Sequence, residues 1–354
     1  MSEESIVVNA ASSVNQASDR HKIQAGLTAL SCLVGSLIIW GALVRLTGSG
    51  LSIPDWPFIN GSLLPPLSAS AWQAAQVDYQ VEAARLGDPA YPADVPHARF
   101  QAMFWIEYLH RTLAAVAGVG FLVLAFFIMR GGALRKELET SLIWMALLLV
   151  AQGLFGGLVV KAALPGLLIA LHLLLAYAFW ALLIWAALKL GRSTAVAGGS
   201  RSAGLQPLVW GWLGLALLVI QSFLGGMVAG AGHFKLVPTW PLMFGRIIPP
   251  SPELGAPAIL TQFLHRWVAF LFLAAYLVLR LKTSPTPLAP SGKLVFRLLD
   301  SLIIVQIILG IANVVMIAPL PISLLHSVCG AGLFAGMVMI LHTLRYGVVD
   351  VVPA

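Results

Sequence analysis

The stretch FWIEYLHRTLA, residues 104–114, places a glutamate, a histidine and an arginine at the head of a long apolar run. The chain around it has 354 residues, of which 59% are hydrophobic and only 10% are charged. Soluble domains carry about 25% charged residues, and a soluble chain this apolar would expose large sticky patches. The composition therefore predicts a polytopic membrane protein, in which Glu107, His110 and Arg111 need a specific explanation.

Eight apolar runs are each long enough to cross a hydrocarbon core of roughly 30 Å. Backbone groups that face lipid must bond within their own segment, so each run is predicted to be an α-helix. The predicted spans are 24–44, 101–129, 141–160, 166–190, 207–230, 258–281, 296–317 and 322–345.

Basic residues are distributed unevenly between the two sides of this topology. One side holds 13 of the 21 lysines and arginines, and the other holds 8 together with most of the loop acids. Because lysine and arginine concentrate on the cytoplasmic side, both termini are predicted to be cytoplasmic. The net charge of +7 reflects this bias and does not suggest nucleic-acid binding. The polar, arginine-free residues 1–19 do not look like a transit peptide, so we expect a bacterial inner (cytoplasmic) membrane.

An internal repeat divides the eight spans into two sets. EYLHR (107–111) reappears as QFLHR (262–266) at an offset of 155, and His172 is followed by His326 at an offset of 154. Each repeat contains four spans, an even number, so the two halves have the same orientation, unlike the inverted repeats of many transporters. The predicted fold is an all-α membrane protein of two parallel-repeat four-helix bundles.

The first outer loop is the place where the halves differ in length. Its Trp-Pro pair is separated from that of the second half by 184 residues, so the first loop holds an insert at about 67–96, which we expect on the outer surface. The predicted domains are a cytoplasmic tail (1–22), an N-terminal bundle (23–190) with outer loop 45–99, a Gly/Ser-rich cytoplasmic linker (191–206), a C-terminal bundle (207–346) and a cytoplasmic tail (347–354).

Four histidines occupy repeat-related positions near the outer ends of the second and fourth spans of each half, namely His110, His172, His265 and His326. Those two spans run in the same direction and can face each other, and bundle cores hold cofactors by side chains from facing helices. Two imidazoles at matched depth suit the axial positions of a haem iron. The alternative for any single one is a helix–helix hydrogen bond. A di-iron site would need several inward carboxylates, and here only Glu107 and His110 form a Glu-x-x-His pair.

Glu107 has no charged counterpart, because the second half carries Gln262 at that position. Residues three apart share a helix face, so Glu107 is predicted to point into the same cavity as His110. A carboxylate inside a membrane is costly and is a functional hypothesis by default. The alternative is a structural ion pair with Arg111 or Arg45. The asymmetry predicts one reactive site and one redox-cofactor site.

Three arginines lie near the predicted sites. Arg111 and Arg266 each follow a histidine by one position, and Arg45 lies at the exit of the first span. They could contact haem propionates through charge-assisted hydrogen bonds, or their side chains could snorkel to the outer interface.

Together these motifs resemble the haem A synthase family over about residues 25–346. The resemblance is carried by RLTGSGLSIPDWP (45–57), EYLHRTLA (107–114), AQGLFGGLVV (151–160), the span with His172, QFLHRWVA (262–269) and LLHSVCGAGL (324–333). It implies oxidation of the C8 methyl of haem O to the formyl group of haem A, which terminal cytochrome oxidases need, with oxygen from water.

The resemblance also implies a role for each site residue. His110 and His172 would bind the substrate haem O, His265 and His326 would ligate a permanent haem b, and Glu107 would act in catalysis. The implied partners are haem O, haem O synthase and cytochrome oxidase assembly factors, in a lipid bilayer, and a homo-oligomer is compatible with the small residues of the spans.

One departure from the family pattern concerns thiols. Many members carry a cysteine pair in the first outer loop, whereas this loop has none and Ile53 occupies one of the two positions. The chain therefore resembles a cysteine-lacking subgroup, in which a thiol-based hand-off cannot operate. Two other functions explain part of the pattern: a di-haem b electron carrier of the quinol-oxidising type, which does not need the single glutamate, and a parallel-repeat transporter, which would need a polar path.

Overall fold

The computed structural model describes residues 3–59, 61–88, 91–192, 200–230, 232 and 235–349. Within them, eight helices are long and apolar enough to cross a membrane, so this is a multi-pass membrane protein and the eight predicted spans are confirmed. The eight are α1 (Glu3–Leu46), α3 (His97–Arg130), α4 (Gly132–Lys161), α5 (Gly166–Leu190), α6 (Leu205–Gly230), α8 (Pro257–Thr283), α9 (Pro290–Val315) and α10 (Leu320–Tyr346). The shorter elements are the 3-10 helix η1 (Ser49–Leu51), α2 (Ala69–Leu86), α7 (Ser251–Leu254), and strands β1 (Ser200–Arg201) and β2 (Val348–Val349), which pair antiparallel.

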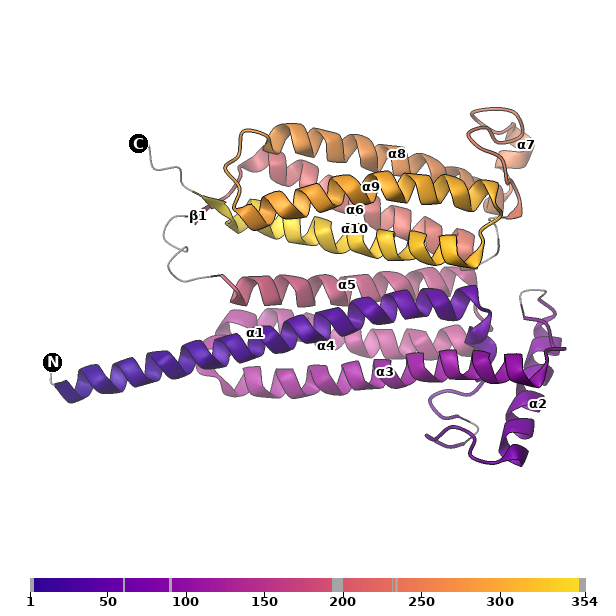
Figure 1. Ribbon diagram of the computed structural model, residues 1–354, viewed down its shortest axis with the longest axis horizontal. Helices are drawn as coiled ribbons and strands as arrows, with labels where there is room; N and C mark the ends of the chain where they lie inside the picture. The colour runs from indigo at the N-terminus through magenta and orange to yellow at the C-terminus, as the bar shows by residue number, and fades with distance from the viewer. Residues whose placement is uncertain are drawn as a thin grey trace.

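The spanning helices form two groups that lie side by side (Figure 1). In the N-terminal bundle, α1 packs on α3 and α5, and α4 packs on α3 and α5. In the C-terminal bundle, α6 packs on α8 and α10, and α9 packs on α10. The bundles meet where α5 contacts α6 and α10, and where α1 contacts α10. Since α5 corresponds to α10 and α6 to α1, these contacts fit a parallel duplication around an axis along the bundle.

Matched backbone turns occur at corresponding places in the two halves. The turn before α5 puts Ala163 and Leu164 at φ 57° and 62°, and the turn before α10 puts Ile317 and Ala318 at φ 58° and 50°. Such left-handed conformations are uncommon for residues other than glycine. The turns are thus related by the offset of 154 found for His172 and His326. The first outer loop has a bridge between Ile59 and Ser62, and the second has one between Met243 and Arg246, at the offset of 184 found for the Trp-Pro pairs. The Trp-Pro bonds of the two loops, Trp56-Pro57 and Trp240-Pro241, are both cis.

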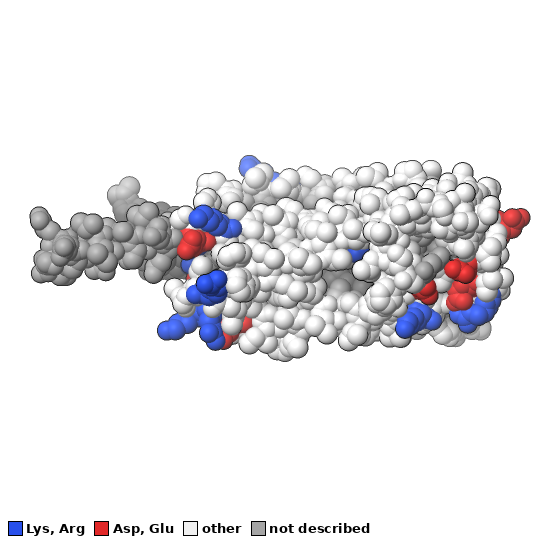
Figure 2. Space-filling view, turned by 90° about the horizontal axis from the view of Figure 1, so that it is seen from below, with Lys and Arg blue, Asp and Glu red and all other residues white. Residues whose placement is uncertain are grey.

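Charged side chains gather at the two ends of the molecule, and the band between them is almost wholly uncharged on the face shown in Figure 2. The β1–β2 pair lies at the same end as the start of α1, while α2 and α7 lie at the opposite end, which we call the outer end (Figure 1). The predicted linker 191–206 and tail 347–354 lie partly outside the described residues. The predicted tail 1–22 is helical from Glu3 onwards, as a continuation of α1.

The insert of the first outer loop is a folded cap at the outer end. Its helix α2 begins after Ser68, whose hydroxyl accepts a hydrogen bond from the Ala71 N–H at 3.1 Å, and ends at Gly87, which has φ 64°. These are standard start and stop signals for a helix. Tyr79 of α2 is fully buried and lies 5.7 Å from Phe100 between ring centroids, so the cap is packed on the outer end of α3. The C-terminal bundle has no such cap among its described residues.

Candidate functional site

The outer loop of the N-terminal bundle folds back onto α3 and is held there by Arg111. Its guanidinium donates hydrogen bonds to the carbonyl oxygens of Ile53 and Asp55, both at 2.6 Å. In the C-terminal bundle, Arg266 donates to the carbonyl oxygens of Val237 and Thr239, at 2.6 and 2.7 Å. The two arginines thus grip repeat-related carbonyls in the same way. Both guanidinium groups donate hydrogen bonds to the outer loops. Their predicted contacts with haem propionates stay a prediction.

Glu107 is buried, with 3% of its surface exposed, and both carboxylate oxygens have donors. Oε2 accepts from the Ser52 hydroxyl at 2.7 Å and from the Ile53 N–H at 3.0 Å, while Oε1 lies 2.5 Å from Nη2 of Arg111. The alternative interpretation of Glu107, an ion pair with Arg111, is therefore present. An ion pair does not exclude catalysis, and the prediction that Glu107 opens into the His110 cavity stays a prediction.

The second half keeps this framework but reverses one hydrogen bond. Gln262, at the position of Glu107, is also 3% exposed, and its Nε2 donates to the Val237 carbonyl at 3.2 Å. Val237 corresponds to Ile53, whose N–H donates to Glu107 instead. One half therefore presents a charged acceptor to its outer loop, and the other presents a neutral donor.

The structure brings the four predicted histidines together in two pairs. His110 of α3 and His172 of α5 lie close enough to interact electrostatically, and so do His265 of α8 and His326 of α10. In each pair, a glutamine from the preceding helix reaches the later histidine. Gln152 Nε2 lies 3.2 Å from His172 Nε2, and Gln306 Nε2 lies 3.3 Å from His326 Nε2.

Each imidazole lies against a glycine of a neighbouring helix. A methyl group added to the glycine would lie within 3.4 Å of the ring Cε1 atom in all four cases. The pairs are Gly41 with His110, Gly156 with His172, Gly225 with His265 and Gly310 with His326. The sequence prediction did not identify these glycines as partners of the histidines, although they recur at the same offsets of 184 and 154. It also missed Ser52 and the contacts of the two glutamines.

The donor set of each pair fits a haem iron. The Nδ1 atoms of His110, His172 and His326 are buried without a hydrogen-bond partner in the structure. Nδ1 of His265 lies 3.2 Å from the Gln221 carbonyl. A carbonyl can only accept, so that ring carries its proton on Nδ1 and leaves Nε2 free, which is the usual arrangement of a metal-binding histidine. In His172 and His326, Nε2 lies against a glutamine amide, which an iron bound at that atom would displace. With that displacement, His265 and His326 could hold one haem, and His110 and His172 another.

Arg45, the third predicted propionate contact, lies where the two bundles meet. Its Nη1 donates to the Ala229 carbonyl of α6 at 2.8 Å. Ala229 occupies the position that corresponds to Arg45 itself, so the contact lies close to the axis that relates the halves. The arginine is partly buried, and it adds a positive charge to the outer end of the interface.

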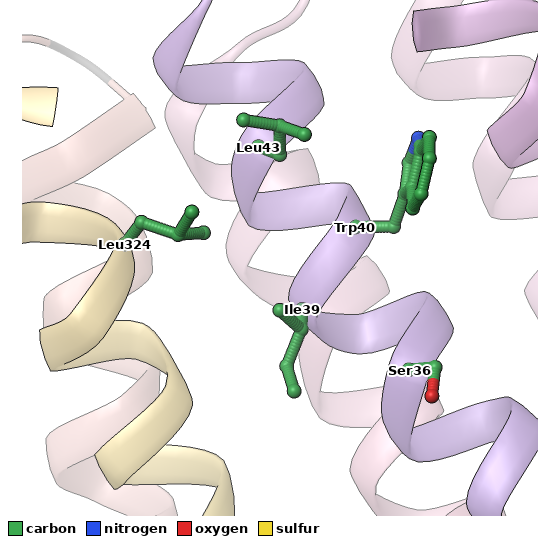
Figure 3. Close-up of a pocket in the computed structure, with 5 residues that line it drawn as sticks. All are labelled: Ser36, Ile39, Trp40, Leu43 and Leu324. Carbon is green, nitrogen blue, oxygen red and sulfur yellow. The ribbon is translucent and has the colours of Figure 1, made fainter. Parts of the chain in front are cut away.

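A separate apolar pocket of about 220 Å³ lies on the outside of α1, where α10 passes it. Figure 3 shows Ser36, Ile39, Trp40 and Leu43 along α1, with Leu324 facing them from α10. Gly41, which contacts His110, is one residue after Trp40 and is therefore turned roughly 100° away on the helix. This pocket therefore lies between α1 and α10, where the two bundles meet, and none of the four histidines lines it.

Comparison with known proteins places this arrangement in a family. The family model described as "COX15-CtaA: Cytochrome oxidase assembly protein" matches residues 25–338. The chain is similar to proteins named "Heme A synthase". It is 33% identical to that of Paracoccus denitrificans over 92% of this chain and 89% of the relative. It is 36% identical to that of Beijerinckia indica over 85% and 86%, and 33% identical to that of Ruegeria pomeroyi over 89% and 86%. The chain belongs to the COX15-CtaA family of cytochrome oxidase assembly proteins.

Proposed function

We propose that this chain is a haem A synthase, which oxidises the C8 methyl of haem O to the formyl group of haem A and keeps a haem b as its redox cofactor. The family membership and the relatives named "Heme A synthase" support the reaction. The two histidine pairs, each with the donor set of a bis-imidazole haem, support the need for two haem sites.

One observation carries the assignment of the sites. The outer loops, the arginines and the histidines of the two halves make corresponding contacts, and within that shared framework only the first half has a carboxylate, that of Glu107. An electron carrier needs no such difference between its two sites. A buried carboxylate beside one haem pocket makes that pocket the one where charge can develop, so the substrate is assigned to His110 and His172.

The proposed reaction is a net oxidation of a methyl group with water as the oxygen source. The methyl carbon loses two of its three hydrogens and gains one oxygen from water as a formyl group. The two hydrogens of that water leave as well, so four protons and four electrons are released in all. A carboxylate held in a water-poor site stabilises positive charge that develops at the carbon, and it can accept a proton from the attacking water. Arg111, Ser52 and the Ile53 N–H fix the orientation of Glu107 for that role.

The second pair, His265 and His326, would hold haem b. When bound, that group supplies one-electron redox chemistry tuned by its axial ligands. The His265 ring is fixed in one tautomer by the Gln221 carbonyl, as a permanent ligand requires. The four electrons released by the methyl oxidation must pass from the protein to an external oxidant.

We place the protein in a bacterial inner membrane, with both termini in the cytoplasm and the haem sites toward the periplasm. The excess of basic residues on one side supports this orientation. The proposed partners are haem O, haem O synthase and cytochrome oxidase assembly factors.

Pigment extraction from the purified protein tests the proposal. A synthase should return haem b together with haem O, its hydroxylated form or haem A. We expect His265→Ala to lose bound haem b and His110→Ala to lose substrate handling while haem b stays. His21→Ala, at an exposed position, is the matched control and should resemble the parent. A protein that returns only haem b would be an electron carrier, and a protein without a Soret band would favour the transporter.

A further inference from the structure

The rings of His110 and His265, the first histidine of each pair, differ in how closely they pack against a neighbouring helix. A methyl group at Gly225 would lie 2.9 Å from Cε1 of His265, whereas a methyl group at Gly41 would lie 3.4 Å from Cε1 of His110. The first distance is shorter than side chains tolerate, and the second is an ordinary van der Waals contact. The ring of His265 therefore lies closer to its neighbouring helix α6 than the ring of His110 lies to α1.

A second, independent contact strengthens the difference. The Gln221 carbonyl accepts from Nδ1 of His265 at 3.2 Å, and the Gln221 side chain donates to the His265 carbonyl at 2.8 Å. The corresponding residue of the first half is Leu37, whose side chain has no donor. Nδ1 of His110 is buried without a partner in the structure. His265 is thus held at its ring and at its backbone, while His110 has neither hydrogen bond.

These glycines are not simply a helix-packing stripe. Gly225 and Gly226 are adjacent, yet only the first contacts a histidine, while a methyl group at the second would meet the Cα of Ala170 at 3.1 Å. By contrast, Gly153, one turn before Gly156 on α4, has open space around the position of a methyl group. On α6, the space beside Gly225 is therefore limited by the imidazole of His265 on α8, and the space beside Gly226 is limited by the backbone of α5.

We propose that Gly225 and Gln221 are positioning residues that lock His265 for a resident haem, and that their counterparts Gly41 and Leu37 leave His110 free to move so that the substrate haem can enter and leave. This inference rests on the proposed function. It explains how two sites of common origin can differ in residence: a ligand whose ring is fixed before binding loses less freedom on binding, and groups that orient a metal ligand typically change metal affinity 10–100-fold.

The test compares haem loss from variants of the full-length protein in detergent, with apomyoglobin as scavenger. Gln221→Leu gives the second half the residue of the first. It removes the side-chain hydrogen bond to the His265 carbonyl and keeps the main-chain acceptor of Nδ1, so we expect it to release haem b about 2–10-fold faster than the parent. Gly225→Ala should also release haem faster, and should in addition shift the visible bands of the bound haem because the ring is displaced. Gly153→Ala is the control, because a methyl group at Gly153 has open space around it. It should keep the parental rate of haem release and the parental visible spectrum.

The reverse exchange tests the first half. Leu37→Gln places a side-chain donor where it can reach the His110 carbonyl, as Gln221 reaches that of His265. It should slow the release of bound haem O without changing that of haem b. Parental release rates and spectra for both Gln221→Leu and Gly225→Ala would overturn this inference and leave the proposed function standing. If Gly225→Ala folds poorly, Gln221→Leu still decides, because leucine and glutamine have similar volumes and the helix contact is kept. A parent protein that purifies without haem would overturn the proposed function together with this inference.

Discussion

Replacing Glu107 by glutamine separates the structural role of its carboxylate from the chemical one. In the wild-type protein, Oε2 faces two donors, from Ser52 and Ile53, and Oε1 faces Arg111. A glutamine has one oxygen, which we expect to remain toward the two loop donors. Its amide nitrogen then faces Arg111, so the ion pair is lost while the loop contacts survive.

The C-terminal bundle, where a glutamine already occupies this position, indicates how much stability Glu107→Gln should lose. Breaking a buried ion pair typically costs about 3–5 kcal/mol, because the remaining charge is left without compensation. Here Arg111 keeps the carbonyls of Ile53 and Asp55, and Arg266 is held by two corresponding carbonyls beside a glutamine. The variant should therefore lose only the value of one charge-assisted hydrogen bond, about 1.5–3 kcal/mol. The fold should survive, with a melting temperature lowered by several degrees.

Two measurements follow from this reasoning. Thermal unfolding in detergent should give the modest destabilisation, and pigment extraction should show haem O bound but not converted to haem A. Glu82→Gln, which breaks an exposed glutamate–arginine pair on the outer cap, is the control and should cost at most about 1 kcal/mol. If Glu107→Gln makes haem A at the parental rate, the carboxylate is not catalytic. If it fails to fold, the second half is not a valid guide to the first.

Two further predictions concern the outer end. Gly157→Ala should destabilise the protein by about 1–3 kcal/mol through overpacking, because its methyl group would lie 2.6 Å from the Trp56 indole. The control is Gly153→Ala, where the space for a methyl group is open. Thermal unfolding should show a lower melting temperature for Gly157→Ala, and equal melting temperatures of the two variants would refute the prediction. Burial raises the pKa of Tyr91 from 10.0 to about 12, so its contribution to the stability of the cap should be complete below about pH 10 and should be lost as the pH rises through 12. Ultraviolet titration of tyrosinate should show a group of late-titrating tyrosines, and Tyr91→Phe should remove one tyrosine from that group.

The spans and the repeat could be predicted from the sequence because each depends on local pattern. Membrane helices are long apolar runs, and most of their observed ends lie within a few residues of the predicted ones. The exceptions are the starts of α1 at Glu3, α4 at Gly132 and α9 at Pro290. The helix α2 was missed because its apolar content is low, although Ser68 and Gly87 are recognisable start and stop signals.

The contacts of the candidate site could be predicted only in part. The residue types and their repeat-related spacing pointed to the histidines and to Glu107. The partners of these residues are distant in sequence and depend on how the chain folds back. Ser52 reaches Glu107 across 55 positions, and Gln221 reaches His265 across 44. A glycine gives no chemical signal of its own, so the contacts of Gly41 and Gly225 with imidazoles become visible only once the helices are packed.

The differences between the halves matter more for function than their likeness. A duplicated bundle begins with two equal histidine pairs, and equal pairs would bind the same haem with the same residence time. Three departures lie on this framework: a carboxylate in place of Gln262, a leucine in place of Gln221, and the α2 cap over the N-terminal bundle. In our proposals the first departure allows chemistry and the second loosens the ligand, while the third covers the outer end of α3. All three fall on the same half, as expected if one half processes a haem that passes through and the other retains a haem that stays.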